Sequence, residues 1–416
     1  MKNRKYATIT GFMGSLQDRF ATYQPKRTME EMVKMASKIK GCSGLEVVYP
    51  QNFTDPAYVR RLLEDNGLGV STVNLNVKGE EKFRYGSFSN PDPAIRKESV
   101  EYGKRAMDCA AELGCNIVTT ALLNDGQDYP FEIDQYDWFM RALEGVREVA
   151  EYRKDVKLSL EYKLAEPRVH CLLNNAGKMG YFCQMTGCDN VGVTLDTGHA
   201  FLALEVPADS ASFLAATNRL FYVHVNDNPR NWDWDLLPGV NNLVEFVEFA
   251  YTLNKVGYEG WLTADVFPGR YDPIKIMEKT FEWMDYIFDI ADQIDPVKLR
   301  EMQEHCHNFE TETAETVTKR LVQAATEVKA VPDYDYLVIN DDVDACADAL
   351  NRIIRGAQAV RDSSGECPEA EAAVQAGQDR LEDQAGSGRV YTEYIQKKSF
   401  AGKFGIGLAE VIARRA

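Results

Sequence analysis

The sequence predicts an α/β fold over residues 1–305, a closed (β/α)8 barrel of eight parallel strands with helices around it. Three observations predict it: short apolar runs alternate with longer amphipathic stretches, there are eight such units, and polar residues end several of the runs. Strand–helix alternation gives parallel strands joined by right-handed crossovers. Eight units of this kind close a barrel of about 250 residues.

Eight short runs rich in β-branched and apolar residues are the predicted strands. They are Tyr6–Gly11, Gly44–Tyr49, Val70–Val77, Cys115–Ala121, Val156–Glu161, Val191–Asp196, Leu220–Asn226 and Gly260–Asp265. Amphipathic stretches between them predict helices, among them Thr28–Ile39, Asp55–Asp65, Pro93–Leu113 and Leu243–Leu253. An open, doubly wound sheet is the rival fold. Its G-x-G-x-x-G turn does not follow the first run, where the chain reads Gly11-Phe-Met-Gly14.

Composition and charge narrow the class of protein. The chain has 416 residues, so a barrel leaves room for further material. Its net charge of −17, from 64 acidic and 47 basic residues, repels phosphate backbones and argues against nucleic-acid binding. We expect no membrane span, because no apolar run approaches the length that one needs. We also expect no signal peptide, because an apolar region with a small-residue cleavage site does not follow the basic residues at the N-terminus. Nine scattered cysteines predict reduced thiols in a cytoplasmic protein.

Four consecutive runs place a potential metal ligand at or near their C-terminal ends: Glu161, Asp196, His224 and Asp265. In a barrel these ends form the active-site face. An inward carboxylate on an apolar strand is costly unless it is paired or binds a metal. Each residue alone would more often be a helix cap or a satisfied core residue, but four at one edge favour a shared cation. Three carboxylates and one imidazole suit Mn²⁺ best, with Mg²⁺ or Co²⁺ as alternatives.

Four motifs resemble the xylose isomerase-like TIM barrel superfamily, and within it the rhamnose isomerases. They are Leu160-Glu-Tyr-Lys-Leu-Ala-Glu-Pro-Arg168, Leu195-Asp-Thr-Gly-His199, His224-Val-Asn-Asp with Trp232-Asp-Trp-Asp235, and Thr263-Ala-Asp265. The resemblance covers residues 5–295. It implies an aldose–ketose isomerase that uses a divalent metal and a hydride shift between two sugar carbons.

The resemblance also implies a role for each matched residue. The first metal would be held by Glu161, Asp196, His224 and Asp265, and the second by Asp196, His199, Asp233 and Asp235. Lys163 would steady the substrate's carbonyl oxygen, so the catalytic set is Lys163, Glu161, His199 and Asp265. The predicted substrate contacts are Asn76, Asp125, Trp232 and Trp234, the two tryptophans forming a wall on which a sugar could stack.

One departure from the family pattern keeps other activities open. Many sugar isomerases carry a histidine on an early strand for ring opening, whereas no histidine precedes His170 here. A single-metal ketose 3-epimerase is one alternative, although Asp265 is shorter than the glutamate those enzymes use. A C-glycoside deglycosidase large subunit, which works with a small partner subunit, is another. A non-catalytic sugar-binding or scaffold barrel is the third. The expected partners are an unphosphorylated sugar or a glycoside and, through helical faces, further copies of the chain.

The remaining residues resemble a different family. Residues 306–360 are similar to the C-terminal end of guanylate kinases, with a helix Glu312–Val328, a strand within Tyr334–Asp342 and a helix Val343–Arg355. The phosphate loop G-x-x-x-x-G-K-[ST] is absent from the chain, so we expect no kinase activity. Residues 361–416 predict a polar linker followed by a short helical tail.

Overall fold

The computed structural model describes residues 4–306, apart from 18, 19, 54 and 167, together with the two short strands Tyr336–Val338 and Tyr394–Gln396. The chain divides into two compact units, Met1–Asp295 and Pro296–Ala416. The first unit contains the barrel. The second contains helix α10 (Pro296–Cys306) and the strands β14 (Tyr336–Val338) and β15 (Tyr394–Gln396), which pair antiparallel.

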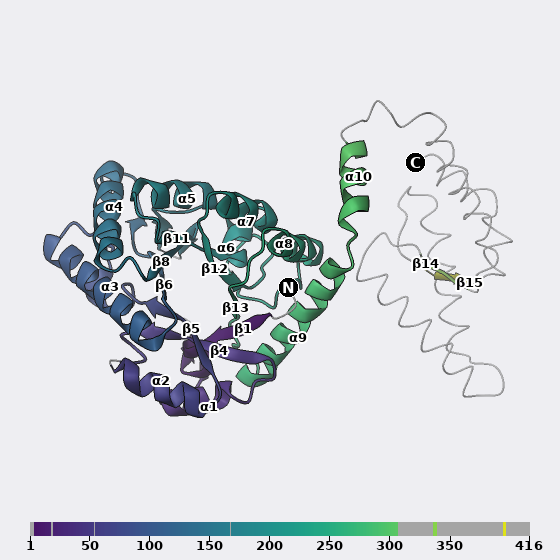
Figure 1. Ribbon diagram of the computed structural model, residues 1–416, viewed down its shortest axis with the longest axis horizontal. Coiled ribbons are helices and arrows are strands. Elements are labelled where there is room, and N and C mark those ends of the chain that lie inside the picture. Colours follow the sequence, from purple (N-terminus) through teal and green to yellow (C-terminus); the bar gives the residue numbers. More distant parts are fainter. Residues whose placement is uncertain are drawn as a thin grey trace. The chain divides into compact units, whose positions relative to one another are not determined.

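Eight parallel strands close the barrel in the order β1-β13-β12-β11-β8-β6-β5-β4 (Figure 1). Their bounds are β1 Lys5–Ile9, β4 Cys42–Tyr49, β5 Gly69–Leu75, β6 Ile117–Ala121, β8 Lys157–Glu161, β11 Val191–Asp196, β12 Leu220–Val225 and β13 Trp261–Ala264. Each of the eight predicted runs overlaps one of these strands, with β1, β4 and β5 beginning one or two residues earlier than predicted. The prediction of a (β/α)8 TIM barrel is therefore confirmed.

Helices follow the barrel strands and cover the outside of the sheet (Figure 1). They are α1 Met29–Ala36, α2 Pro56–Asp65, α3 Pro93–Leu113, α4 Gln135–Tyr152, α5 Ala176–Met185, α6 Thr197–Leu202, α7 Pro207–Ala216, α8 Leu243–Lys255 and α9 Pro273–Asp292. The sequence sets the ends of α3 directly. Asp92 caps its first turn by accepting a hydrogen bond from the Ala94 N–H, and Gly114 ends it in the left-handed conformation, with φ of 76°.

Smaller elements lie in the connections between barrel strands and helices. They are the 3₁₀ turns η1 (Thr10–Met13) and η2 (Glu81–Phe83), the pair β2 (Leu16–Gln17) and β3 (Thr22–Gln24), and a three-stranded sheet of β7 (Gly126–Gln127), β10 (Val169–Cys171) and β9 (Ala165–Glu166). The three-stranded sheet joins the connections that follow β6 and β8. It therefore lies at the end of the barrel where the predicted site residues are.

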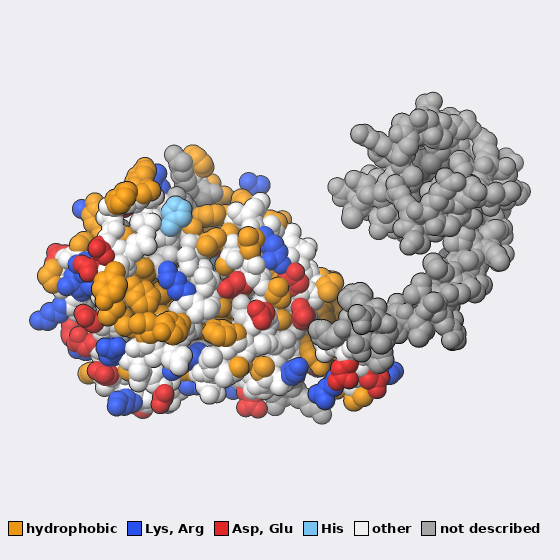
Figure 2. All heavy atoms as spheres, turned by 90° about the horizontal axis from the view of Figure 1, so that it is seen from above, with side chains coloured by type: hydrophobic (Ala, Val, Ile, Leu, Met, Phe, Trp, Pro, Cys, Tyr) orange, Lys and Arg blue, Asp and Glu red, His pale blue; other side chains and the backbone are white. Residues whose placement is uncertain are grey.

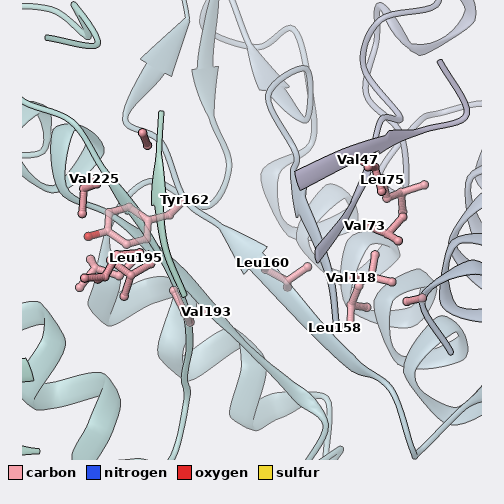
Figure 3. Close-up of a cluster of buried hydrophobic side chains, with 14 of the residues drawn as sticks. Val47, Val73, Leu75, Val118, Leu158, Leu160, Tyr162, Val193, Leu195 and Val225 are labelled. Atoms are coloured by element: carbon pink, nitrogen blue, oxygen red, sulfur yellow. The ribbon is translucent and has the colours of Figure 1, made fainter. Parts of the chain in front are cut away.

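Side chains alternate between the two faces of each strand, and this alternation divides the core into two layers. Leu158 and Leu160 of β8 belong to the hydrophobic cluster between sheet and helices, which Figure 3 shows with its neighbours from adjacent strands. Ser159 of the same strand points into the barrel, where its Oγ lies 2.7 Å from Thr194 Oγ1. Thr119 Oγ1 lies 2.7 Å from the same hydroxyl. The barrel interior below the site is thus filled partly by paired hydroxyl groups.

Charges of both signs are mixed on the barrel face that Figure 2 shows, without a field of one sign. Within the described part of the chain, none of the helices has the length and apolarity that crossing a membrane requires. Six cysteines of the barrel are free thiols: Cys42, Cys109, Cys115, Cys171, Cys183 and Cys188.

Most of the predicted guanylate kinase-like segment lies outside the described residues, including both of its predicted helices. Strand β14 falls within the predicted strand Tyr334–Asp342. Strand β15 is the part of 390–416 that the structure describes, so the predicted short helical tail of that stretch stays a prediction. The aromatic Tyr394 and the β-branched Ile395 favour the extended conformation found there.

Candidate metal centre

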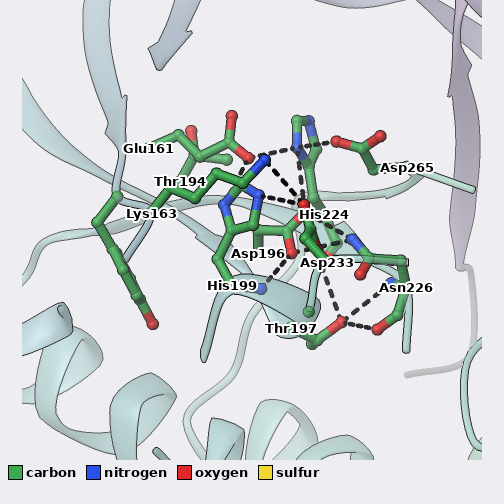
Figure 4. A network of polar contacts seen from close by, with 12 residues as sticks. Glu161, Lys163, Thr194, Asp196, Thr197, His199, His224, Asn226, Asp233 and Asp265 are labelled. Carbon is green, nitrogen blue, oxygen red and sulfur yellow. Dashed lines mark hydrogen bonds and ion pairs between the residues drawn. The ribbon is translucent and has the colours of Figure 1, made fainter. Parts of the chain in front are cut away.

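Four barrel strands bring the predicted ligands of the first metal together at their C-terminal ends. Glu161 ends β8, Asp196 ends β11, His224 lies near the end of β12, and Asp265 follows β13. One ligand atom of each residue lies within 4.8 Å of the others. Figure 4 shows these side chains converging from their separate strands. Glu161, Asp196 and His224 are buried, and Asp265 is partly exposed.

The Nδ1 atom of His224 faces three carboxylates. It lies 3.3 Å from Glu161 Oε1, 3.4 Å from Asp265 Oδ2 and 3.7 Å from Asp196 Oδ2. A single N–H proton cannot serve three acceptors. Atoms that share a cation at bond lengths of about 2.1 Å lie roughly 3.0 to 3.5 Å from one another. The separations around Nδ1 are close to those of a coordination shell.

The opposite nitrogen of His224 is held by a residue from the far side of the barrel. Glu46 of β4 is fully buried, and its Oε2 lies 2.9 Å from His224 Nε2. Asn74 Nδ2 donates to the other oxygen of Glu46 at 2.5 Å. Glu46 therefore keeps a proton on Nε2 and turns Nδ1 toward the three carboxylates, as the outer partners of metal-binding histidines do.

We expect Glu46→Gln to weaken metal binding by about tenfold to a hundredfold, because the amide removes the negative charge that makes His224 a stronger donor. The barrel should still fold, since a glutamine oxygen can accept the same Nε2 hydrogen bond and Asn74 can rotate its amide to match. The measurement is a competition titration of Mn²⁺ between the protein and a chelating dye. Glu151→Gln, at an exposed position, is the matched control. Equal affinity in both variants would contradict the role of Glu46.

A second group of potential ligands shares Asp196 with the first. Asp196, His199 and Asp233 each place a ligand atom within 4.8 Å of the others. His199 lies on α6, whose first turn Asp196 caps by accepting the His199 N–H at 2.9 Å. His199 Nε2 lies 3.1 Å from Asp233 Oδ2, and Lys163 Nζ lies 3.0 Å from the same oxygen. The acidic loop that follows β12 therefore reaches back over the ends of β8 and β11.

Two buried atoms of this second group lack a hydrogen-bond partner in the described part of the chain. They are Asp233 Oδ1 and His199 Nδ1, the latter lying 3.3 Å from Glu161 Oε1 without making a hydrogen bond. A buried polar atom without a partner costs about 1–3 kcal/mol, so such atoms call for an explanation. A bound cation would explain both, and the oxygen-rich donor set suits Mn²⁺, Mg²⁺ or Co²⁺. The residues present therefore fit one or two divalent ions.

The pKa values describe a site with an excess of negative charge. Burial raises the pKa of Asp196, and the carboxylates of Asp265 and Glu161 add to this against the opposing effect of His199, to about 6. Burial also disfavours the charged form of His224, but the carboxylates of Glu46 and Glu161 outweigh it and raise its pKa well above the usual value. The protein compensates for clustered carboxylates with protonated imidazoles. A divalent cation would supply that compensation directly.

Asn226, the residue directly after β12, holds the side chain of Asp196 in place. Asn226 Nδ2 donates to both Asp196 oxygens, at 2.9 and 2.8 Å. A side chain at Gly198 would not fit, because a Cβ built there meets Asn226 Oδ1 at 1.7 Å. The glycine in the Asp-Thr-Gly-His motif is thus required by the close approach of Asn226.

The structure places the other predicted site residues as follows. Asp235 is not part of the second ligand group; it takes a left-handed conformation with φ of 48°, and burial and the nearby Asp233 raise its pKa well above the usual value. Trp232 is half-buried, whereas Trp234 is exposed and donates from Nε1 to Asn231 at 2.8 Å.

Two predicted substrate ligands make hydrogen bonds within the protein. Asp125 is buried and accepts bonds from both the backbone and the hydroxyl groups of Ser87 and Ser89. Asn76 Oδ1 accepts the backbone N–H groups of Lys78 and Gly79. Both side chains therefore order the loops around the site, and direct contact of either with a substrate stays a prediction.

Sequence reasoning left Glu46 and Asn226 out of the site. Glu46 could have been found, because it is a carboxylate inside an apolar strand, the same signal that selected Glu161 and Asp196. Asn226 ends the predicted run Leu220–Asn226, but only the structure shows that its side chain holds Asp196.

Comparison with known proteins finds relatives by sequence and by fold. The family described as xylose isomerase-like TIM barrel matches residues 33–287. The chain is 25% identical over 237 residues to L-ribulose 3-epimerase of Mesorhizobium japonicum, covering 56% of this chain and 75% of the relative. It is 26% identical over 207 residues to xylose isomerase of Thermus thermophilus, covering 48% of this chain and 54% of the relative.

Solved structures show the same fold. A structure of L-ribulose 3-epimerase aligns with a TM-score of 0.56 and 20% identity, covering 70% of this chain and 96% of that one. The 3-keto-D-glucoside 4-epimerase of E. coli aligns with a TM-score of 0.52 and 16% identity, covering 68% and 100%. The relatives found by sequence are named as sugar isomerases and epimerases. The chain belongs to the xylose isomerase-like TIM barrel family.

Proposed function

We propose that this protein is a divalent-metal-dependent sugar isomerase that interconverts an aldose and a ketose, with Mn²⁺ as the preferred ion. The observation that carries the proposal is the second ligand group, Asp196, His199 and Asp233, which adjoins the first through a shared carboxylate. The Nζ atom of Lys163 lies 3.0 Å from Asp233 Oδ2 of this group. A site with room for two cations and an ammonium group suits a reaction in which charge develops on two adjacent sugar oxygens.

Bound cations would polarise neighbouring oxygens of the open-chain sugar and lower the cost of alkoxide charge. Burial disfavours the ammonium charge of Lys163, but Asp233 and Glu166 outweigh that effect and raise its pKa above the usual value. Lys163 therefore stays protonated and can donate a hydrogen bond to the sugar's carbonyl oxygen. In a hydride shift the hydrogen passes directly between two carbons of the sugar, so no side chain has to remove it.

The substrate class in this proposal is an unphosphorylated aldose or ketose. The names of the relatives, L-ribulose 3-epimerase and xylose isomerase, support a free sugar. The many carboxylates at the strand ends also disfavour a phosphate group there, because like charges would be brought together.

A single-metal epimerase is the second candidate. Glu161 Oε1, at the end of β8, lies 3.3 Å from His224 Nδ1, and Asp265 Oδ2, directly after β13, lies 3.4 Å from the same nitrogen. Two carboxylates placed on different sides of a sugar carbon could remove a proton from one face and return it to the other. This chemistry does not need the second ligand group or Lys163.

Deuterium labelling separates the two candidates. We would strip the full-length protein with a chelator, reload it with Mn²⁺, and incubate it with aldoses and ketoses in D₂O. NMR of an aldose–ketose product without deuterium at the transferred position is the result expected for a hydride shift. Deuterium at an inverted carbon would instead establish the epimerase. Metal binding without turnover of any free sugar would contradict both and direct the search to glycosides.

A further inference from the structure

The candidate metal ligands occupy only half of the barrel. They come from β8, β11, β12 and β13, which are neighbours in the closed sheet. The other half is formed by β6, β5, β4 and β1. A sugar bound to a cation on the first half must present its remaining oxygens to the second half. The polar groups of that second half therefore decide how the sugar is held.

Two charged side chains of this second half are already engaged by the protein. Glu46 of β4 contacts His224 and Asn74. Asp125, after β6, accepts hydrogen bonds from Ser87 and Ser89. Neither carboxylate is free to select a ligand, and both are acceptors that a sugar's carbonyl oxygen could not use.

Lys78, in the turn after β5, differs from both. No hydrogen bond or ion pair of its ammonium group is found among the residues that the structure describes. Lys163, by contrast, has carboxylates of Asp233 and Glu166 within contact distance. The residue Lys78 is partly exposed, and its ammonium group is buried among protein groups. Because they have no partner among the described residues, its N–H donors are available to a ligand.

The backbone of Lys78 is fixed on both sides, which gives its side chain a defined origin. Its N–H donates to Asn76 Oδ1 at 3.1 Å, and its carbonyl accepts a hydrogen bond from Asn124 Nδ2 at 2.9 Å. Asn76 itself continues the β4–β5 pairing by donating its N–H to Tyr49 O at 2.8 Å. Two asparagines thus hold the turn at the edge of the barrel.

The ammonium of Lys78 lies within electrostatic reach of the metal-ligand cluster. Its burial lowers its pKa, and it interacts electrostatically with Glu161, Glu46 and Asp265, favourably, and with Lys163, unfavourably. Glu161 ends β8, Glu46 lies in β4 and Asp265 follows β13, so these interactions place the ammonium toward the end of the barrel where the candidate metal ligands are.

We propose that Lys78 is a substrate-binding residue that donates hydrogen bonds to an oxygen of the open-chain sugar, from the half of the barrel opposite the metal ligands. The inference rests on the proposed action on a sugar at this end of the barrel. Lys78 and Lys163 would then hold two different oxygens of one substrate. The preferred ligand is an open-chain polyol with an oxygen acceptor beside the metal-bound oxygens.

The test compares Lys78→Met with Lys78→Arg and with Lys154→Met, an exposed lysine on the same chain. Three quantities are measured on full-length, Mn²⁺-loaded protein: Mn²⁺ affinity, calorimetric binding of the alditols ribitol, arabinitol and xylitol, and kcat and KM for whichever sugar turns over. Alditols are open-chain and unreactive, so their binding reports on contacts alone.

We expect Lys78→Met to have an alditol affinity and a kcat/KM that are each about tenfold to a hundredfold lower than those of the wild type. The reason is that a charge-assisted hydrogen bond is worth about 1.5–3 kcal/mol. Mn²⁺ affinity and the unfolding temperature should match those of Lys154→Met. Lys78→Arg should recover part of the alditol affinity. Unchanged alditol binding in Lys78→Met, or a loss of Mn²⁺ equal to the loss of alditol, would overturn the inference.

The outcomes separate this inference from the proposed function. Turnover that is the same in wild type and Lys78→Met would leave the isomerase standing and remove Lys78 from it. Alditol binding that depends on Lys78, without turnover of any sugar, would support the inference and contradict the isomerase. A wild-type protein that neither binds alditols nor turns over a sugar would contradict both.

Discussion

Replacing Asp196 by asparagine is expected to lower metal-dependent turnover by at least about a thousandfold, because this carboxylate belongs to both ligand groups. One substitution therefore weakens two cation sites, whereas Glu161 and His224 each serve one ligand group. Metal analysis after gel filtration should find Mn²⁺ in the wild type and little or none in the variant. Asp189→Asn, at an exposed position, is the matched control.

The fold should tolerate Asp196→Asn. Asparagine is as good a helix cap as aspartate, so the His199 N–H keeps its acceptor. Asn226 donates to Asp196 and has an unpaired Oδ1, so it can rotate its amide to accept from the new side chain. The variant should thus lose its metal without losing its barrel.

Thermal unfolding with and without metal gives this prediction a second readout. Because the pKa of Asp196 is raised to about 6 in the folded chain, ionising it above that pH costs stability in the metal-free protein. The variant removes that cost and should be at least as stable as the wild type without metal at pH 7.5. With Mn²⁺ at about 100 times its Kd, the wild type should gain about 2.7 kcal/mol and the variant nothing. A variant less stable in both conditions would mean that Asp196 is structural only.

The barrel could be predicted from the sequence because each strand carries two signals at once. Runs such as Val156–Glu161 are apolar on the face that packs against helices and polar on the face that lines the interior. The helices between them have local start and stop signals, as Asp92 and Gly114 show for α3. Because these signals are local in the sequence, they can be identified before the fold is known.

The metal ligands were predictable for a related reason. Strand ends of one barrel meet at one face, so four donors in sequence order become four donors in space. Asp233 could be assigned only through the family resemblance, because its contact with His199 depends on how the loop after β12 folds back. Asp235, two residues further on, is half-buried and interacts electrostatically with Asp233 and Asp265, yet it places no ligand atom in either group, which no spacing in the sequence would reveal.

The contacts that cross the barrel could not be predicted. Glu46 and His224 are 178 residues apart, and their 2.9 Å contact exists only because β4 and β12 face each other across a closed sheet. Asp125 looked like a substrate ligand from its place after a strand, yet both of its oxygens are bonded to the loop that contains Ser87 and Ser89. Position at the active-site face identifies candidates, and their partners then decide what each one does.

Replacing Lys163 by methionine is expected to lower kcat by about a hundredfold to a thousandfold, because it removes the donor proposed to stabilise the carbonyl oxygen as charge develops. Methionine keeps most of the side-chain volume, so the half-buried connection after β8 should fold unchanged. KM should change much less than kcat if the hydrogen bond strengthens in the transition state. Lys154→Met, measured in parallel, controls for the loss of a positive charge from the chain.

Metal affinity decides how a loss of activity in Lys163→Met is interpreted. Lys163 Nζ lies 3.0 Å from Asp233 Oδ2, so the substitution leaves that carboxylate with one fewer positively charged neighbour. Asp233 should then bind a cation at least as tightly as before, because a competing positive charge is gone. Retained Mn²⁺ with a reduced kcat would therefore place Lys163 in the chemistry. Retained Mn²⁺ with full activity would favour the single-metal epimerase, which has no use for this lysine. A variant that loses Mn²⁺ would show instead that Lys163 holds the loop of Asp233 in place, and the isomerase proposal would lose its proposed hydrogen-bond donor to the sugar's carbonyl oxygen.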